Sequence, residues 1–346
     1  MEFLSEYGMF LAKAITLLGV VLAATAGIIA LSSRGTVGKP KEHIEVKSLN
    51  DHYRDMAHTL QMAMLPHSAA KKAFKEEKKR RKAEEKQAKK AQDRQRHRLF
   101  VLDFHGDIKA SAVNSLREEI TAILSVATPD DEVLVKLESA GGMVHAYGLA
   151  ASQLQRIRDR NIPLTAAVDK VAASGGYMMA CVADRILAAP FAILGSIGVI
   201  TQLPNFHRLL KKNDIDFEQI TAGEFKRTLT LFGENTDSAR QKLREEVEEV
   251  HDLFKRFVTD HRPQVEIDRV ATGEHWHGSR ALDLKLVDEL KTSDDYLLES
   301  SEKRDLYEVR YVAKKPLMTR LLSVGTQLLH PRHSLMQNDN PLPPVH

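Results

Sequence analysis

The segment VAASGGYMMAC, residues 171–181, places a single serine, Ser174, directly before two glycines and an apolar run. A serine here can be the N-cap of a helix, because its hydroxyl can accept a hydrogen bond from an amide of the first turn. It can also be a nucleophile, with glycines that let a substrate carbonyl approach the backbone. The first interpretation is structural, whereas the second makes the protein an acyl-transfer enzyme.

A serine nucleophile needs a base that accepts its proton. Histidine oriented by a carboxylate is the usual base, and the chain has 15 histidines, so their number does not exclude one. None of them lies in a segment that the sequence places beside Ser174. The alternative base is a lysine, since burial lowers the pKa of an amine and can keep it neutral.

Alternating strands and helices are expected to position Ser174. Apolar runs at 98–104 and 131–139 predict buried strands, with a helix of regular apolar spacing between them. Residues 146–161 predict a second helix, and residues 162–172 predict a third strand that leads into the serine. This alternation is typical of parallel strands joined by right-handed crossovers, and therefore of an α/β fold.

The segment 177–200 is apolar enough to resemble a membrane span. Asp184, Arg185 and Pro190 interrupt it, so we interpret it as buried core. Its Cys181 is the single cysteine of the chain, which excludes an intrachain disulfide. We expect Cys181 to be a small buried hydrophobic residue.

A long amphipathic helix is predicted after this core. It covers residues 237–262, with Thr236 or Asp237 as its cap and Pro263 at its end. The predicted apolar face consists of Leu243, Val247, Val250, Phe254 and Phe257. Such a helix either covers the core of its own chain or contributes to contacts between subunits.

The N-terminus, residues 1–35, is predicted to be a membrane anchor. Residues 14–31 carry no charge and are long enough as a helix to cross a hydrocarbon core. A cleaved signal peptide is the alternative, with a small-residue site at 24–26. The weakly basic start and the apolar run beyond that site favour an uncleaved anchor. Positive charges after residue 33 favour a cytoplasmic domain, although long domains can be translocated despite such charges.

Residues 36–97 are predicted to be a juxtamembrane segment with a helical linker. Basic residues greatly outnumber acidic ones at 71–98, although the net charge of the whole chain is only +3. We interpret this run as a solvated spacer, or as a contact with anionic lipid headgroups. Apart from Phe74, no Phe, Tyr or Trp is interleaved for base stacking, so nucleic acid is not an expected partner. The proline-rich tail, residues 332–346, is predicted to be disordered.

Four motifs in the same order resemble the signal peptide peptidase A family of serine–lysine membrane proteases, in particular its single-domain bacterial members. They are SAGGMV at 139–144, AASGGYMMA at 172–180, GSIGVI at 195–200 and TAGEFKRTLTLF at 221–232. The resemblance runs from about residue 98 to 295 and includes the hydrophobic N-terminus. It implies a ClpP/crotonase-like superhelix of strand–helix units for a protease domain at 98–331.

The resemblance also assigns roles to individual residues. It implies that Ser174 is the nucleophile, that Lys226 is the general base and acid, and that Ser196 orients the lysine. Backbone amides would form the oxyanion hole, contributed by Gly141, Gly142 and Gly175. One departure from the family pattern is Ala140, which replaces a proline that would stiffen the turn before these glycines.

The predicted function is therefore a membrane-anchored serine endopeptidase that cleaves extended apolar peptides through an acyl-enzyme. Residual signal peptides and misfolded membrane-protein fragments are the substrates that the resemblance implies. It further implies a homo-oligomer at the bacterial inner membrane, with the catalytic domain on the periplasmic side and no metal or organic cofactor. The alternatives are a catalytically silent membrane-anchored scaffold and an acyl-CoA enzyme of the crotonase-like fold.

Overall fold

The computed structural model describes residues 2–34, 42–66, 79, 97–223 and 225–313. The chain divides into two units, one made of residues 1–43 and 312–346 and the other of residues 44–311. Most of the basic run and the whole proline-rich tail lie outside the described residues.

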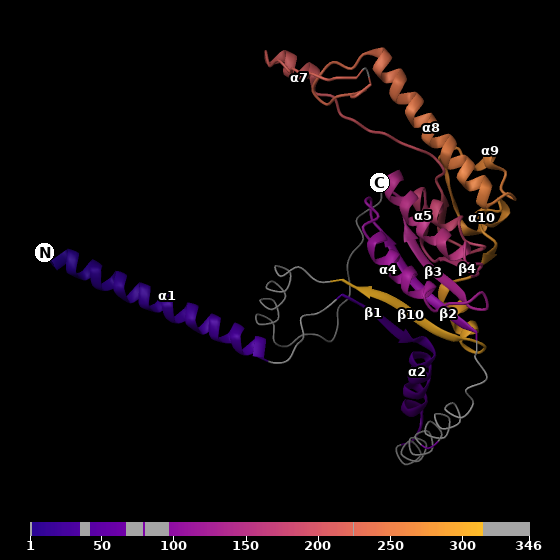
Figure 1. The fold of residues 1–346 in the computed structure, drawn as a ribbon, viewed down its shortest axis with the longest axis horizontal. Helices are drawn as coiled ribbons and strands as arrows, with labels where there is room; N and C mark the ends of the chain where they lie inside the picture. Colours follow the sequence, from indigo (N-terminus) through magenta and orange to yellow (C-terminus); the bar gives the residue numbers. More distant parts are fainter. Residues whose placement is uncertain (1, 35–41, 67–78, 80–96, 224, 314–346) are drawn as a thin grey trace. The chain divides into compact units, whose positions relative to one another are not determined.

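The first unit contains one long helix, α1 (Glu2–Arg34), at the N-terminus (Figure 1). The sequence predicts a membrane span at residues 14–31. In the described part of the chain, no helix combines the length and the apolar character that a membrane crossing requires. The side chains described on α1 include the charged Glu6 and Lys13.

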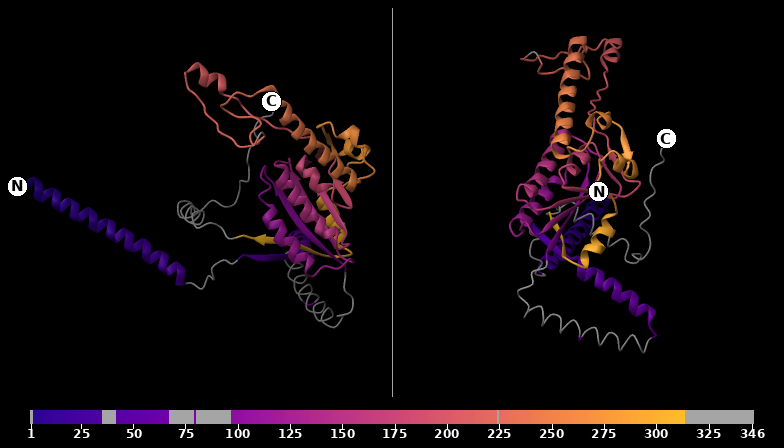
Figure 2. Two further views of the ribbon diagram at one scale, coloured as in Figure 1. Left: turned by 45° about the horizontal axis from the view of Figure 1, so that its top comes forward. Right: turned by 90° about the vertical axis from the view of Figure 1, so that its right-hand side faces the viewer.

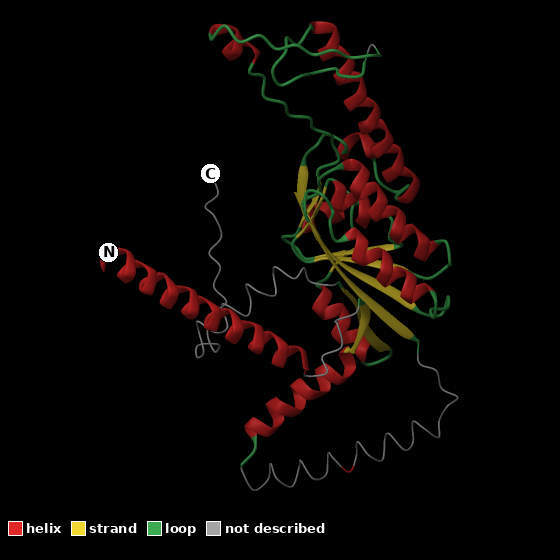
Figure 3. Cartoon of the chain, turned by 60° about the vertical axis from the view of Figure 1, so that its left-hand side comes forward, coloured by secondary structure: helices red, strands yellow, loops and turns green. Residues whose placement is uncertain are grey.

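The second unit is built on a ten-stranded, mostly parallel sheet (Figures 1 and 3). The strand order is β1-β10-β2-β3-β4-β6-β9, while β5 pairs with β3 and β7, and β7 pairs with β8. The strands are β1 (His43–Ser48), β2 (Arg98–Gly106), β3 (Glu132–Ser139), β4 (Leu164–Val168), β5 (Val171–Ala173), β6 (Arg185–Ala188), β7 (Ile193–Gly195), β8 (His275–His277), β9 (Glu289–Leu290) and β10 (Asp305–Val312). The α/β fold class is therefore confirmed.

Helices bury both faces of the central strands. On one face, α4 (Val113–Leu124), α5 (Val144–Arg158) and α6 (Gly175–Ala180) contribute to the main core. On the other, α2 (Leu49–Met64) and α11 (Ser293–Ser301) pack over a smaller core that includes Leu99 and Val101. Burial on both faces explains why the central strands read as nearly continuous apolar runs.

The start of the compact unit lies before residue 98. Strand β1 is a neighbour of β10, and the Asn50 side chain on α2 bonds the Ser301 and Arg304 carbonyls and the Leu306 amide. These contacts join residues 44–66 to the sheet, whereas the sequence analysis assigned them to the juxtamembrane segment.

The predicted elements around Ser174 are confirmed, with one change. The predicted strand 162–172 is divided into β4 and β5 by a break at Asp169 and Lys170. As a result, β3 pairs first with β4 and then, at Ser139, with β5. Cys181 is fully buried, as predicted. The interpretation of the apolar segment around it as core is also confirmed.

A long helix, α8 (Asp237–His261), connects the core to an exposed arm (Figure 2). Thr236 caps α8 by accepting a hydrogen bond from the Ala239 amide, as the sequence predicts. Only Phe254 and Val258 of α8 are buried, both in its C-terminal half. The arm, residues 199–236, includes α7 (His207–Lys212), and none of the described residues between 198 and 253 is buried.

The remaining helices follow α8. They are α9 (Ile267–Val270) and α10 (Gly278–Asp283). Arg262, directly after α8, anchors the helix to the core with a bidentate bond to Asp288, at 2.8 Å for both N–O pairs. This guanidinium is only 2% exposed.

Candidate active site

Ser174 occupies a strained turn between β5 and α6. Its backbone has φ 52° and ψ −118°, a combination that non-glycine residues rarely adopt. Although it stands at the N-cap position, its side chain accepts no capping hydrogen bond. The half-buried hydroxyl is therefore not used as a helix cap, although Ser174 keeps a strained backbone at the end of β5.

The pairing of β5 with β7 brings Ser196 next to Ser174. The two strands are parallel, with Ala173 opposite Gly195, and the Ser174 amide donates to the Gly195 carbonyl at 2.8 Å. Ser196 also has a positive φ of 51°, and its amide donates to the Glu274 carbonyl at 2.6 Å. Both serines thus leave neighbouring strands through constrained turns at the same edge.

The glycine turn at Gly141 and Gly142 lies against the Ser174 turn. A Cβ added at Gly141, where φ is +91°, would lie 2.8 Å from both the Ser174 Cβ and the Gly175 nitrogen. A Cβ at Gly142 would collide with the Ile108 backbone. Side chains are therefore excluded at both positions, which keeps backbone amides close to the serine.

The three glycine amides named from the sequence are not equivalent. The Gly141 amide already donates to the Ser139 hydroxyl at 3.1 Å. No acceptor within the described residues is recorded for the amides of Gly142 and Gly175, and the latter belongs to the first turn of α6, where amides have no intrahelical partner. These two amides are the ones available to a developing oxyanion.

Lys226 is not brought to the serine within one chain. It is exposed on the arm, where its amide donates to the Gly223 carbonyl at 3.2 Å. Its surroundings are arm residues, including Phe217 and Phe232, around a hollow of about 630 Å³. The tertiary structure therefore assembles Ser174, Ser196 and the glycine turn, and leaves the predicted base apart from them.

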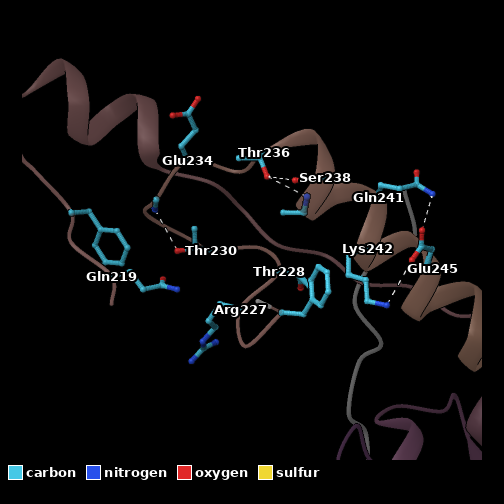
Figure 4. A pocket seen from close by; sticks show the side chains of 14 residues that line it. Gln219, Arg227, Thr228, Thr230, Glu234, Thr236, Ser238, Gln241, Lys242 and Glu245 are labelled. Carbon is cyan, nitrogen blue, oxygen red and sulfur yellow. Dashed lines mark hydrogen bonds and ion pairs between the residues drawn. The ribbon is translucent and has the colours of Figure 1, made fainter. Parts of the chain in front are cut away.

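A second hollow, of about 600 Å³, adjoins the arm segment that follows Lys226. Ser174 is not among the residues that line it (Figure 4). Figure 4 shows Lys242 and Glu245 on α8 and Thr228 on the neighbouring arm segment, while the Arg227 side chain points away from α8. The Lys242 ammonium lies 5.3 Å from the centroid of the Phe225 ring. This contact joins the arm segment around Lys226 to the N-terminal half of α8.

Beneath the site, α6 rests on a fully buried layer. The Tyr177 hydroxyl donates to the Leu286 carbonyl at 2.9 Å, and burial raises the pKa values of both Tyr177 and Cys181 above their ordinary range. Within the described ranges, no group of three His, Cys, Asp or Glu side chains is arranged to hold a metal ion.

Sequence reasoning missed Ser139 and Tyr147. The Tyr147 hydroxyl lies 2.6 Å from the Ser139 hydroxyl and donates to the Asp107 carbonyl at 2.7 Å. Ser139 lies two residues before Gly141 in the same motif, which was a usable signal. Tyr147 follows in a helix of small apolar residues, and nothing in its spacing distinguishes it from core.

Comparison with known proteins identifies the family. Residues 2–154 match the model described as peptidase family S49 N-terminal, and residues 156–307 match peptidase family S49. The probable protease SohB of Haemophilus influenzae is 49% identical over 328 residues, which cover 92% of each chain. A putative signal peptide peptidase SppA of Enterococcus faecium is 26% identical over 53% of this chain and 54% of its own.

Among solved structures, a mutant of the membrane-bound stomatin-specific protease 1510-N in complex with a substrate peptide is similar. It is 15% identical, covers 67% of this chain and 99% of its own, and has a TM-score of 0.41, which is too low to support an argument. The two family matches and the SohB relative confirm the resemblance that the four motifs indicated. The chain therefore belongs to peptidase family S49 and is a protease of that family.

Proposed function

We propose that the chain is a serine endopeptidase in which Ser174 is the nucleophile and Lys226 the general base. The observation that carries this proposal is the Ser174 turn, strained and without a capping bond, beside two available glycine amides. A serine that only capped a helix would use its hydroxyl for that purpose and would not need a strained backbone.

The reaction proceeds through an acyl-enzyme. The Lys226 amine takes the proton of the Ser174 hydroxyl while Oγ attacks the peptide carbonyl carbon. The amides of Gly142 and Gly175 donate to the resulting oxyanion. As the C–N bond breaks, the lysine gives its proton to the leaving amine, and a water molecule activated by the same lysine then hydrolyses the acyl-serine. Ser196 orients the lysine amine.

A neighbouring copy of the chain supplies the lysine. The 25 residues of α8 form one unbroken helix, about 37 Å long, whose C-terminal half is anchored to the core. The arm at its other end exposes large apolar side chains, among them Ile200, Leu209, Ile215, Ile220 and Phe225. An apolar surface of this kind is typical of a protein interface, and burial there would also desolvate the Lys226 amine.

The substrates are extended peptides with apolar side chains, such as residual signal peptides or fragments of misfolded membrane proteins. Ile108, Met143 and Val144 adjoin the glycine turn and are 71%, 42% and 44% exposed. They form an apolar surface beside the nucleophile on which such side chains can pack. We assign the strand–helix arrangement to the ClpP/crotonase-like superhelix, for which the motif pattern is the support.

Attachment to the inner membrane, with the catalytic domain on the periplasmic side, is part of the same proposal. The uncharged sequence of residues 14–31 is its only support, and the described helices add none. Extraction of cell membranes with alkaline carbonate tests it, because an anchored chain stays with the lipid and a peripheral one is released. A reporter fused to the C-terminus identifies the side of the membrane.

The catalytic proposal is tested with the full-length chain on an unfolded protein and on apolar fluorogenic peptides. Ser174→Ala and Lys226→Ala should both abolish cleavage, whereas Lys212→Ala, which removes another exposed arm lysine, should not. Equimolar mixing of the two inactive variants should restore about a quarter of the parent activity, because that share of sites combines an intact serine with an intact lysine.

The alternative outcomes are equally specific. No recovery on mixing, with both variants still inactive, places serine and lysine in the same chain. Full activity of Lys226→Ala excludes it as the base. A parent that cleaves nothing supports the scaffold or acyl-CoA interpretation.

A further inference from the structure

Four groups around the glycine turn form a hydrogen-bond chain whose direction is fixed by its ends. The Gly141 amide can only donate, and the Asp107 carbonyl can only accept. Because the Tyr147 hydroxyl gives its proton to Asp107, it must accept one from Ser139. The Ser139 hydroxyl in turn accepts the Gly141 amide hydrogen at 3.1 Å. The three hydrogens of this hydrogen-bond chain therefore point the same way, from Gly141 toward Asp107.

Tyr147 also contacts the backbone that follows the nucleophile. A Cβ at Gly175 would collide with the Tyr147 ring, so the ring lies directly against the Gly175 backbone. A Cβ at Gly106 would collide with the hydroxyls of both Ser139 and Tyr147. The glycines permit this close packing, and Tyr147 itself is fully buried. Tyr147 thus contacts the Gly175 backbone directly and is linked to the Gly141–Gly142 turn through the Ser139 hydroxyl.

The hydrogen-bond chain ends at a loop, residues 107–111, that has hydrogen bonds of its own. The Asp107 carboxylate accepts hydrogen bonds from the Ser111 hydroxyl at 2.6 Å and from the Ser111 amide at 2.8 Å. The Ile108 carbonyl in the same loop accepts the Met143 amide at 2.8 Å. The glycine turn is therefore attached to this loop at two points, one of them through Tyr147 and Ser139.

We propose that Tyr147 and Ser139 are positioning residues that hold the Gly141–Gly142 turn against the Gly175 amide, so that the two available amides converge beside Ser174. This inference rests on the proposed protease function. Neither side chain touches the substrate; they act through the backbone amides. Burial raises the pKa of Tyr147 above its ordinary value, which keeps the phenol protonated and able to donate. The turn lacks a stiffening proline at Ala140, and the hydrogen-bond chain supplies the rigidity instead.

The test uses the full-length chain and three variants. Tyr147→Phe removes one hydroxyl and keeps the ring, and Ser139→Ala removes the acceptor of the Gly141 amide. Tyr177→Phe is the matched control, because Tyr177 is equally buried and also donates to a backbone carbonyl, but contacts Leu286 rather than the turn. Peptide cleavage gives kcat and KM, and hydrogen–deuterium exchange of the peptide spanning residues 140–146 reports on the turn.

Tyr147→Phe and Ser139→Ala are each expected to lower kcat by about 10- to 100-fold with little change in KM, which is less than the loss of a whole oxyanion donor. The kcat of the double variant should be little lower than that of either single variant, since both substitutions interrupt the same hydrogen-bond chain. Exchange at the turn should become about tenfold faster in both, and not in Tyr177→Phe. A Tyr147→Phe enzyme no slower than Tyr177→Phe, or losses in kcat that simply multiply, would overturn the proposal.

Failure of the proposed function gives a different pattern. If Ser174→Ala cleaves as well as the parent, the catalytic assignment is wrong, whatever the exchange data show. If Ser174→Ala is inactive while Tyr147→Phe keeps both parent activity and parent exchange at the turn, the protease stands and the positioning role is refuted.

Discussion

The Ser174 amide donates to the Gly195 carbonyl at 2.8 Å, so the Ser174 turn and the Ser196 turn are joined by the last hydrogen bond of the β5–β7 pairing. Both serines have a positive φ. Glycine could adopt this conformation without strain, but serine cannot. The strain is maintained because the strand pairing fixes both backbones at the same edge of the sheet. This relationship places Ser196 directly after the residue that is opposite Ala173 in the register, beside Ser174.

Replacement of Ser196 is therefore expected to affect the chemical step. Ser196→Ala should lower kcat by roughly 10- to 100-fold at nearly unchanged KM, because in the proposed mechanism the hydroxyl orients the base and does not bind the peptide. Steady-state kinetics check this. Ser152→Ala is the control, since that exposed hydroxyl bonds only the Gly148 carbonyl of its own helix. Equal kinetics for the two variants would remove Ser196 from the site.

Two glycines of the same region should respond in opposite ways to alanine. Gly141→Ala places a Cβ 2.8 Å from the Ser174 Cβ at a positive φ, so activity should be lost. Gly148→Ala, inside α5, meets no atom within 4 Å and should raise the free energy of unfolding by about 0.5–1 kcal/mol. Cleavage assays and urea denaturation measure the two effects. An active Gly141→Ala enzyme would contradict the close approach of the two turns.

Breaking the ion pair that anchors α8 should lower stability. Arg262 is 2% exposed, whereas the Asp288 side chain is 32% exposed and also accepts a hydrogen bond from the Ile186 amide. Arg262→Met removes both hydrogen bonds to this carboxylate, and we expect a loss of about 1–3 kcal/mol in the free energy of unfolding. The exposed pair between Arg280 and Asp283 is the control, for which Arg280→Met should cost no more than about 1 kcal/mol. Similar losses for both variants would be inconsistent with the anchoring of α8.

One carboxylate predicts a specific pH dependence of stability. Burial alone would raise the pKa of Asp131, but hydrogen bonds from Arg98 and Thr128 outweigh it and lower the pKa to about 2. Because the unfolded value is about 3.9, this ion pair contributes about 2 kcal/mol that is present above pH 4 and lost as the pH falls through 2. Urea denaturation from pH 6 to 2 should show a shallower decline for Asp131→Asn. Parallel curves for the two proteins would refute this assignment.

The thiol of the single cysteine should be unreactive in the folded protein. Cys181 is fully buried, and burial raises the pKa of its thiol, so little reactive thiolate is present. A chromogenic disulfide reagent at pH 8 should react with it only after unfolding in denaturant. Reaction of the native chain within minutes would show that the α6 layer opens readily.

The sequence by itself determined the local elements and indicated the family. The apolar run of β2, the Thr236 cap of α8 and the burial of Cys181 follow from short-range patterns, because periodicity, capping and apolar composition act within a few residues. The motif order also indicated the family, and the family comparisons confirm it. The roles of Ser174 and Lys226 remain predictions until the variants are measured.

Only the tertiary structure decided which residues meet. It joined Ser174 to Ser196 through the β5–β7 pairing, attached α2 to the sheet through Asn50, and tied Tyr147 to Ser139. It also left Lys226 exposed on an arm without buried residues, apart from Ser174. The physical reason is that such contacts depend on strand register and on long-range packing. Register and packing are settled by the burial of the whole core and not by the residues adjacent in sequence.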